Sequence, residues 1–104
     1  MKTVYHKLVR DLIPEIIEKS GKRCACSILS EQAYLEALDA KLAEELNEYP
    51  QDHSMEELAD LLEVIRAVIA ARGSTYEEVE AIRIEKARQR GGFEKRILLI
   101  ETED

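Results

Sequence analysis

The chain has 104 residues, of which 45% are hydrophobic and 36% are charged, and its formal net charge is −7. This length suits a single domain with one modest core, so residues 1–104 are predicted to form one domain of a soluble, helix-rich protein. The sequence pI of about 4.9 argues against a nucleic-acid polymer as partner, because contacts to phosphates need a basic surface.

The sequence also argues against a membrane-spanning or secreted protein and against a zinc site. No segment approaches the roughly 18 apolar residues of a membrane span, and the N-terminus lacks an apolar run of signal-peptide length. We therefore expect a cytoplasmic protein without a membrane partner. A zinc site would need Cys24 and Cys26 together with His6 and His53. We instead interpret the two cysteines as small apolar residues on one face of a strand.

The first predicted elements are a short helix and a strand. Residues 10–20 are expected to be helical, with Pro14 in the first turn and Gly21 ending the helix. The segment RCACSIL, residues 23–29, is too short for a helix and is rich in small and β-forming residues. It is therefore predicted to be a strand.

Three further helices follow, each with a residue that can cap its N-terminus. Ser30 precedes a helix over residues 31–49, whose apolar residues recur at spacings of three and four. The segment PQDHS is expected to break this helix. The next two helices are predicted at 55–72, after Ser54, and at 76–90, after Thr75 and before two glycines.

The tail segment RILLI, residues 96–100, reads as a second strand. Two lone strands near opposite ends of the chain would satisfy their backbone groups by pairing with each other. The predicted fold is therefore mainly α. It is a helical bundle built on an antiparallel helix hairpin, with a small two-stranded β appendage formed by the N- and C-terminal parts.

Four carboxylates lie at similar heights on the predicted hairpin. A connection of about five residues makes helices 31–49 and 55–72 antiparallel neighbours. Two acidic residues precede the connection and two follow it, and each pair has the spacing i, i+3 that places both side chains on one side of the helix. Oxygen ligands without nearby His or Cys favour a hard cation such as Mg²⁺ or Mn²⁺. The predicted ligands are Glu45, Glu48, Glu57 and Asp60.

Helix 55–72 is apolar around almost its whole circumference, which indicates burial on more than one side. Glu57 falls on the same side as Val64 and Val68, where an unpaired carboxylate is costly unless it binds a cation. Two alternatives remain open. Ser54 and Glu57 match a capping box, and the acidic residues could also form a solvated helix face.

The acidic segments resemble those of a known enzyme family. EELNE (44–48) followed by EELAD (56–60) resembles the ExxE…ExxD signature of the all-α nucleoside triphosphate pyrophosphohydrolases, which include MazG, the dimeric dUTPases and phosphoribosyl-ATP pyrophosphohydrolase. The flanks YHKLVRDLIPEIIEKSGK and KARQRGGFEKRILLIE are similar to the small, single-domain branch of that superfamily. The resemblance covers essentially the whole chain. It implies that the two acidic motifs hold Mg²⁺.

The resemblance also implies a reaction, the Mg²⁺-dependent hydrolysis of a nucleoside triphosphate to the monophosphate and pyrophosphate. Such an activity would suit house-cleaning of non-canonical nucleotides. Glu44 lies about 40° from Glu48 around the helix and is a candidate base for the attacking water. A triphosphate needs cationic partners as well. The candidates are Lys86 and Arg90 in the basic C-terminal motif, and Lys7 and Arg10 in KLVRD.

Two other functions stay open. One is hydrolysis of phosphoribosyl-ATP in histidine synthesis, and the other is a catalytically silent helical module whose acidic hairpin binds a protein. For the leading interpretation, a nucleotide pyrophosphohydrolase, helix 55–72 needs more cover than one chain of this length offers. We therefore expect a homodimer or homotetramer.

Overall fold

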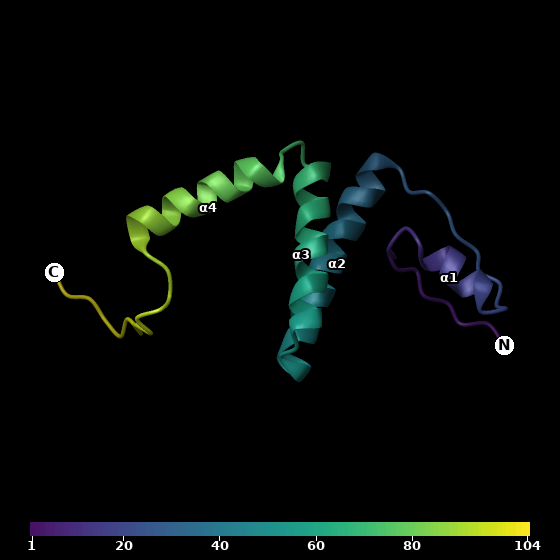
Figure 1. Cartoon of the computed structure of the whole chain (residues 1–104), viewed down its shortest axis with the longest axis horizontal. Coiled ribbons are helices and arrows are strands. Elements are labelled where there is room, and N and C mark those ends of the chain that lie inside the picture. Colours follow the sequence, from purple (N-terminus) through teal and green to yellow (C-terminus); the bar gives the residue numbers. More distant parts are fainter.

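A computed structural model describes residues 1–104 and contains four helices joined by irregular segments (Figure 1). A central hairpin separates the N-terminal part from the last helix, which projects on the opposite side (Figure 1). No helix combines the length and the apolarity that crossing a bilayer requires. The helices are α1 (Ile13–Lys19), α2 (Glu31–Asp52), α3 (Met55–Ala71) and α4 (Tyr76–Arg90).

The three long helices begin where local capping chemistry predicts. Ser30, Ser54 and Thr75 have extended backbones, and each side chain accepts a hydrogen bond from the amide three residues further along, at 3.1–3.2 Å. These bonds satisfy amides that lack a partner inside the helix. The mainly helical fold and the starts of these helices are confirmed.

The predicted helix break at Pro50 is wrong. Helix α2 continues through Pro50 to Asp52 and ends at His53, which has a left-handed backbone (φ 55°) and donates its amide to the carbonyl of Tyr49 at 2.8 Å. Proline lacks an N–H and so removes one helical hydrogen bond, but this loss falls in the last turn, where the helix is about to end. Only His53 and Ser54 therefore connect α2 to α3.

Helices α2 and α3 pack side by side and supply the small apolar core (Figure 1). The buried apolar residues are Leu38 from α2 and Val64 and Ile69 from α3. Other large apolar side chains of the hairpin stay open, and Leu62 is 56% exposed. Within one chain, α3 therefore lacks the cover around its circumference that its sequence predicts.

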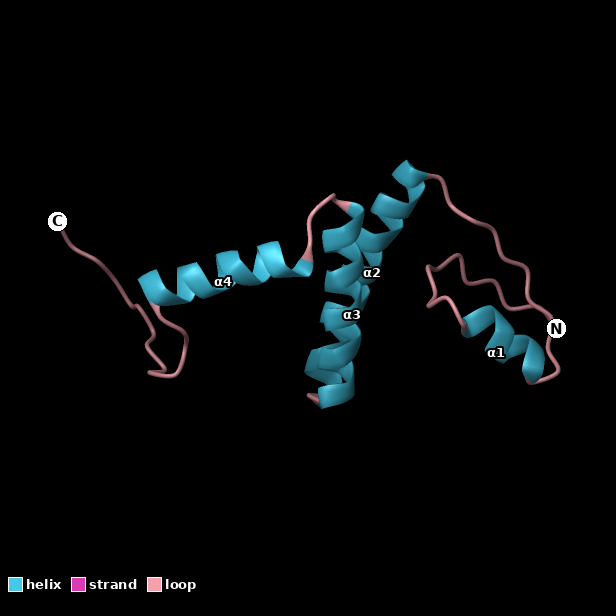
Figure 2. Cartoon of the chain, turned by 45° about the horizontal axis from the view of Figure 1, so that its top comes forward, coloured by secondary structure: helices cyan, strands magenta, loops and turns pink.

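The predicted β appendage is also not formed, because no residue adopts a strand (Figure 2). Residues 23–29 connect α1 to α2 on one side of the hairpin, whereas residues 96–100 follow α4 on the other side (Figure 1). Helix α4 projects from the end of α3 and carries the tail away, so the two segments cannot pair. The molecule is consequently elongated, with extents of 63 × 32 × 24 Å.

Candidate metal centre

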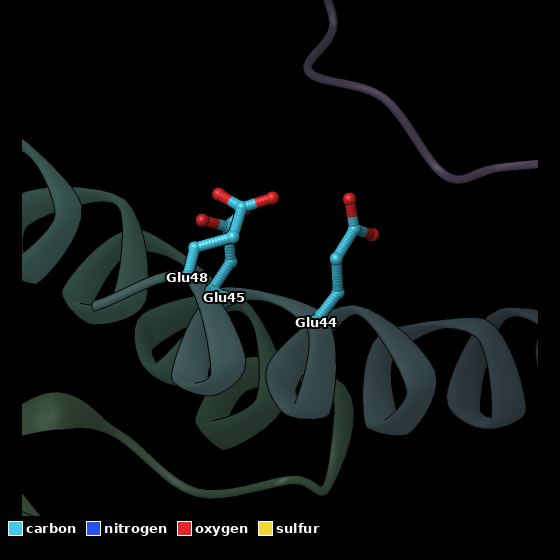
Figure 3. A group of neighbouring side chains, drawn as sticks. All are labelled: Glu44, Glu45 and Glu48. Atoms are coloured by element: carbon cyan, nitrogen blue, oxygen red, sulfur yellow. The ribbon is translucent and has the colours of Figure 1, made fainter. Parts of the chain in front are cut away.

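The two-residue connection brings the acidic residues of α2 and α3 together. Two groups of three carboxylates each have oxygens within 4.8 Å of one another, and Glu45 belongs to both groups. The side chains of Glu44, Glu45 and Glu48 stand on the same side of α2 (Figure 3). The first group is Glu44, Glu45 and Glu48, and the second is Glu45, Glu57 and Asp60. All four predicted metal ligands thus belong to one continuous cluster.

Glu45 is the most buried member of the cluster and is 7% exposed. Its Oε1 lies 3.4 Å from Nζ of Lys41, but its Oε2 is buried without a hydrogen-bond partner. Oε2 of Glu57 is also buried without a partner. Buried polar atoms in folded proteins are almost always satisfied, so these two oxygens are candidates for contact with a cation or another donor.

The carboxylates of this cluster repel one another. Burial raises the pKa of Glu57 above its ordinary value of 4.5, and the nearby carboxylates of Glu48, Asp52 and Asp60 raise this pKa further. A proton shared between two carboxylates relieves this repulsion. A divalent cation would relieve it more fully, because it offers positive charge to several oxygens at once.

The capping-box alternative for Glu57 is only half formed. The Ser54 hydroxyl accepts a hydrogen bond from the amide of Glu57 at 3.2 Å, as a capping box requires. In a full capping box the amide of Ser54 would donate to the carboxylate of Glu57. Here it donates instead to Oδ1 of Asp52 at 3.1 Å. The carboxylate of Glu57 is therefore free of the cap and lies among the acidic residues of the cluster.

Lys7 and Arg10, predicted to contact phosphates, lie at the cluster and pair with its carboxylates. Nζ of Lys7 is 2.6 Å from Oε1 of Glu44, and Nη2 of Arg10 is 2.8 Å from Oδ1 of Asp60. The hydrogen bond from Lys7 lowers the pKa of Glu44 and raises the pKa of Lys7 itself. The N-terminal segment thus brings two cations to an acidic surface far away in sequence.

Lys86 and Arg90 are not brought to the cluster within one chain. The carboxylates lie in the last turns of α2 and the first turns of α3, whereas α4 starts beyond the other end of α3 and leads away (Figure 1). Both side chains are exposed. A contact between these cations and a site ligand would therefore require another arrangement of α4 or a second copy of the chain.

The predicted site omits Lys41, which contacts two of its acidic residues. Its Nζ lies 3.5 Å from Oε2 of Glu44 and 3.4 Å from Oε1 of Glu45, and the side chain is only 20% exposed. The signal was present in the sequence, because Lys41 precedes the two glutamates by three and four residues on one helix face. Lys41 is therefore a cation already positioned beside the cluster.

Comparisons with known proteins assign no family to this geometry. No protein-family model and no solved structure matches the chain. A protein of Mycolicibacterium smegmatis, described as an uncharacterized protein, is 52% identical over 42 residues. That alignment covers 40% of this chain and 43% of the relative. The functional proposal therefore depends on the site itself and on its sequence motifs.

Proposed function

We propose that the chain is a Mg²⁺-dependent nucleotide pyrophosphohydrolase, with Mn²⁺ as an alternative ion. The observation that carries the proposal is the buried, unpartnered Oε2 of Glu45 at the junction of two carboxylate groups. A buried charge without a counterion is unfavourable, and hard divalent cations prefer oxygen ligands. The resemblance of EELNE and EELAD to the ExxE…ExxD signature supports the same ion and reaction.

Each of the two helices provides two of the four proposed metal ligands. Glu45 and Glu48 from α2 and Glu57 and Asp60 from α3 would supply the oxygens that hold the ion, from two adjacent helices. When bound, a divalent cation neutralises phosphate oxygens and acidifies a water molecule. In the proposed reaction, water attacks the α-phosphorus, the bond from this phosphorus to the bridging oxygen breaks, and pyrophosphate leaves with that oxygen.

The remaining charged residues have roles in proton transfer and phosphate binding. Glu44 accepts the proton of the attacking water, which requires that Lys7 leave its carboxylate. Lys7 and Arg10 then pair with the negative triphosphate, and Lys41 is already placed to do so. Cations beside the phosphates stabilise charge that develops in the transition state.

We also propose that the active form is a homodimer or homotetramer. The support is the apolar surface that a single chain leaves open, since only Leu38, Val64 and Ile69 form its buried apolar core. A second copy would cover α3 and could bring Lys86 and Arg90 near a cluster. A symmetric contact of the hairpin with its own copy is the simplest arrangement.

The proposal is tested by measuring pyrophosphate release with and without Mg²⁺. The panel contains canonical and modified nucleoside triphosphates and phosphoribosyl-ATP, which separates the two enzymatic hypotheses. In ¹⁸O-labelled water, attack at the α-phosphorus places the label in the nucleoside monophosphate. Mg²⁺ binding without turnover of any nucleotide would contradict the enzymatic proposal and favour a silent interaction module.

A further inference from the structure

A cleft of about 490 Å³ lies between the N-terminal segment and the hairpin. Seven of its thirteen lining residues are hydrophobic. Leu8, Val9 and Ile13 line the cleft from the N-terminal side, while Leu38 and Val64 line it from the hairpin. This volume is typical of sites for small organic molecules, and the lining combines seven hydrophobic residues with six charged ones.

The cleft is continuous with the candidate metal centre. Glu45 and Asp60, two of the proposed metal ligands, also line it, and so does Lys41. The ion pair between Arg10 and Asp60, at 2.8 Å, joins the N-terminal segment to the hairpin at this place. A molecule in the cleft would therefore have its apolar part between aliphatic side chains and its anionic part beside the cluster.

Tyr34 is the only aromatic residue that lines the cleft. The chain has no Trp, four Tyr and one Phe. The others are engaged or placed elsewhere. Tyr49 makes an edge contact with His53 at 5.3 Å between ring centroids, and the ring of Tyr76 lies 4.5 Å from Cζ of Arg66. Tyr5 and Phe93 are 70% and 98% exposed and do not line the cleft.

Helix geometry places Tyr34 on the same face of α2 as Glu45. The two residues are eleven positions apart, which corresponds to about three turns and a rise of about 16 Å. Tyr34 and Glu45 therefore lie near two ends of one helix face, and both line the cleft. The amide of Tyr34 is bonded to the carbonyl of Ser30 at 2.8 Å, so the first turn of α2 holds the residue in place.

We propose that this cleft binds the base of the nucleotide and that Tyr34 is the aromatic surface on which the base stacks. This inference rests on the proposed function, because it takes the metal centre as the phosphate end of the same site. It assigns a specificity-determining role to Tyr34 and to residues 8–11 and 13, which line the cleft opposite the hairpin. The ligand class is a nucleotide whose base enters between aliphatic walls.

The test compares Tyr34→Leu with Tyr34→Phe, which keeps the ring, and with Tyr5→Leu, which makes the same change outside the cleft. Calorimetry measures the binding of α,β-methylene nucleoside triphosphates, inorganic tripolyphosphate and Mg²⁺, and a parallel assay measures pyrophosphate release. The Tyr34→Leu variant loses one stacking contact and should therefore bind nucleotides about tenfold more weakly than the wild type. Tripolyphosphate and Mg²⁺ binding should not change, and both control variants should match the wild type.

The measurements separate this inference from the proposed function. If the wild type releases pyrophosphate but Tyr34→Leu binds nucleotides as Tyr5→Leu does, the stacking role is wrong and the hydrolase remains. An equal loss of tripolyphosphate binding would also overturn it, because tripolyphosphate has no base. If the analogues bind through Tyr34 without any pyrophosphate release, the inference stands and the hydrolase fails. Absence of nucleotide binding by the wild type overturns both.

Discussion

Glu45 joins the two halves of the candidate metal centre, because its carboxylate belongs to both groups of three. Lys41 neutralises one of its oxygens, and the other is buried without a partner. The neighbours of Glu45 are therefore expected to govern both ion binding and local stability. Variants of Glu48 and Glu57 separate these two effects, since Gln keeps the size of Glu and removes its charge.

Replacement of Glu48 by Gln should abolish ion binding without unfolding the protein. Replacing a residue that only supports a metal ligand lowers metal affinity or activity roughly 10–100-fold. Replacing a direct ligand should therefore lower Mg²⁺ affinity at least about 100-fold. Calorimetric titration with Mg²⁺ and the pyrophosphate assay measure this loss. Glu56→Gln is the matched control, because Glu56 is exposed on α3 and outside the cluster. An unchanged Mg²⁺ titration for Glu48→Gln would exclude Glu48 as a ligand.

Replacement of Glu57 by Gln should abolish turnover and, without divalent cations, should stabilise the fold in a pH-dependent way. The folded-state pKa of Glu57 is raised above 4.5, first by burial. The stability from its neutral form is therefore complete below the unfolded pKa and is lost as pH rises through the folded pKa. Gln stays neutral throughout, so the variant should gain melting temperature over the wild type at pH 7.5 and little at pH 4.

Thermal unfolding of both proteins in EDTA measures this difference. If Glu57 only caps the helix, Glu57→Gln should keep full activity, because Gln also serves at that position of a capping box. Equal melting temperatures at pH 7.5 would show that the carboxylate of Glu57 is not under charge repulsion.

At the scale of the elements, the turn between α3 and α4 depends on one glycine. Gly73 has φ 85° and donates its amide to the carbonyl of Ala70 at 3.1 Å, while the next amide, from Ser74, bonds to Ile69 at 3.0 Å. These bonds end α3 in the left-handed conformation that glycine adopts most readily. Gly73 therefore fixes the point from which α4 leaves the hairpin.

Gly73→Ala should destabilise the fold by about 1 kcal/mol, because a side chain is strained in this backbone conformation. Space is not the cause, since an added Cβ meets nothing within 4 Å. Gly92→Ala is the control, as Gly92 has open space and no positive φ, and it should change stability by less than about 0.5 kcal/mol. Urea unfolding followed by circular dichroism measures both. Equal effects of the two substitutions would contradict the assignment of strain to residue 73.

The helices were predictable where local chemistry determines them, as at Ser30, Ser54 and Thr75, whose side chains bond to amides three residues away. The hairpin and the relative heights of its carboxylates followed from the short connection and the helical repeat. Pro50 was misread, because the effect of a proline depends on how soon the helix ends after it. The strand pair was wrong because pairing depends on where α4 carries the tail.

The candidate site was also predictable only where local sequence spacing determines it. The carboxylates of α2 and α3 came together as the spacing predicted, because each pair lies on one helix near the connection. The ion pairs of Lys7 and Arg10 with Glu44 and Asp60 were not predictable. They depend on the path of an irregular segment over the hairpin, and no local pattern encodes that path. The cleft with Tyr34 depends on the same path.

At the scale of the whole molecule, the open apolar surface of the hairpin leads to a prediction about assembly. We expect Val68→Glu to give monomers or aggregates with reduced activity, because it places a charge on a half-buried face of α3 that a second copy would cover. Ala70→Glu is the control, since Ala70 is exposed on the opposite side of the helix. Light scattering at micromolar concentration gives the mass of each protein. A stable wild-type monomer would refute the homo-oligomer.

The elongated form of the chain has a hydrodynamic consequence. Its Cα radius of gyration is 18.6 Å, whereas a compact domain of about 100 residues has a value near 13 Å. An elongated particle meets more friction than a sphere of equal mass, and so it leaves a gel-filtration column earlier. One extended copy would therefore elute at an apparent mass well above its true 11.9 kDa. Subunits that fold α4 back on assembly would elute closer to their true mass.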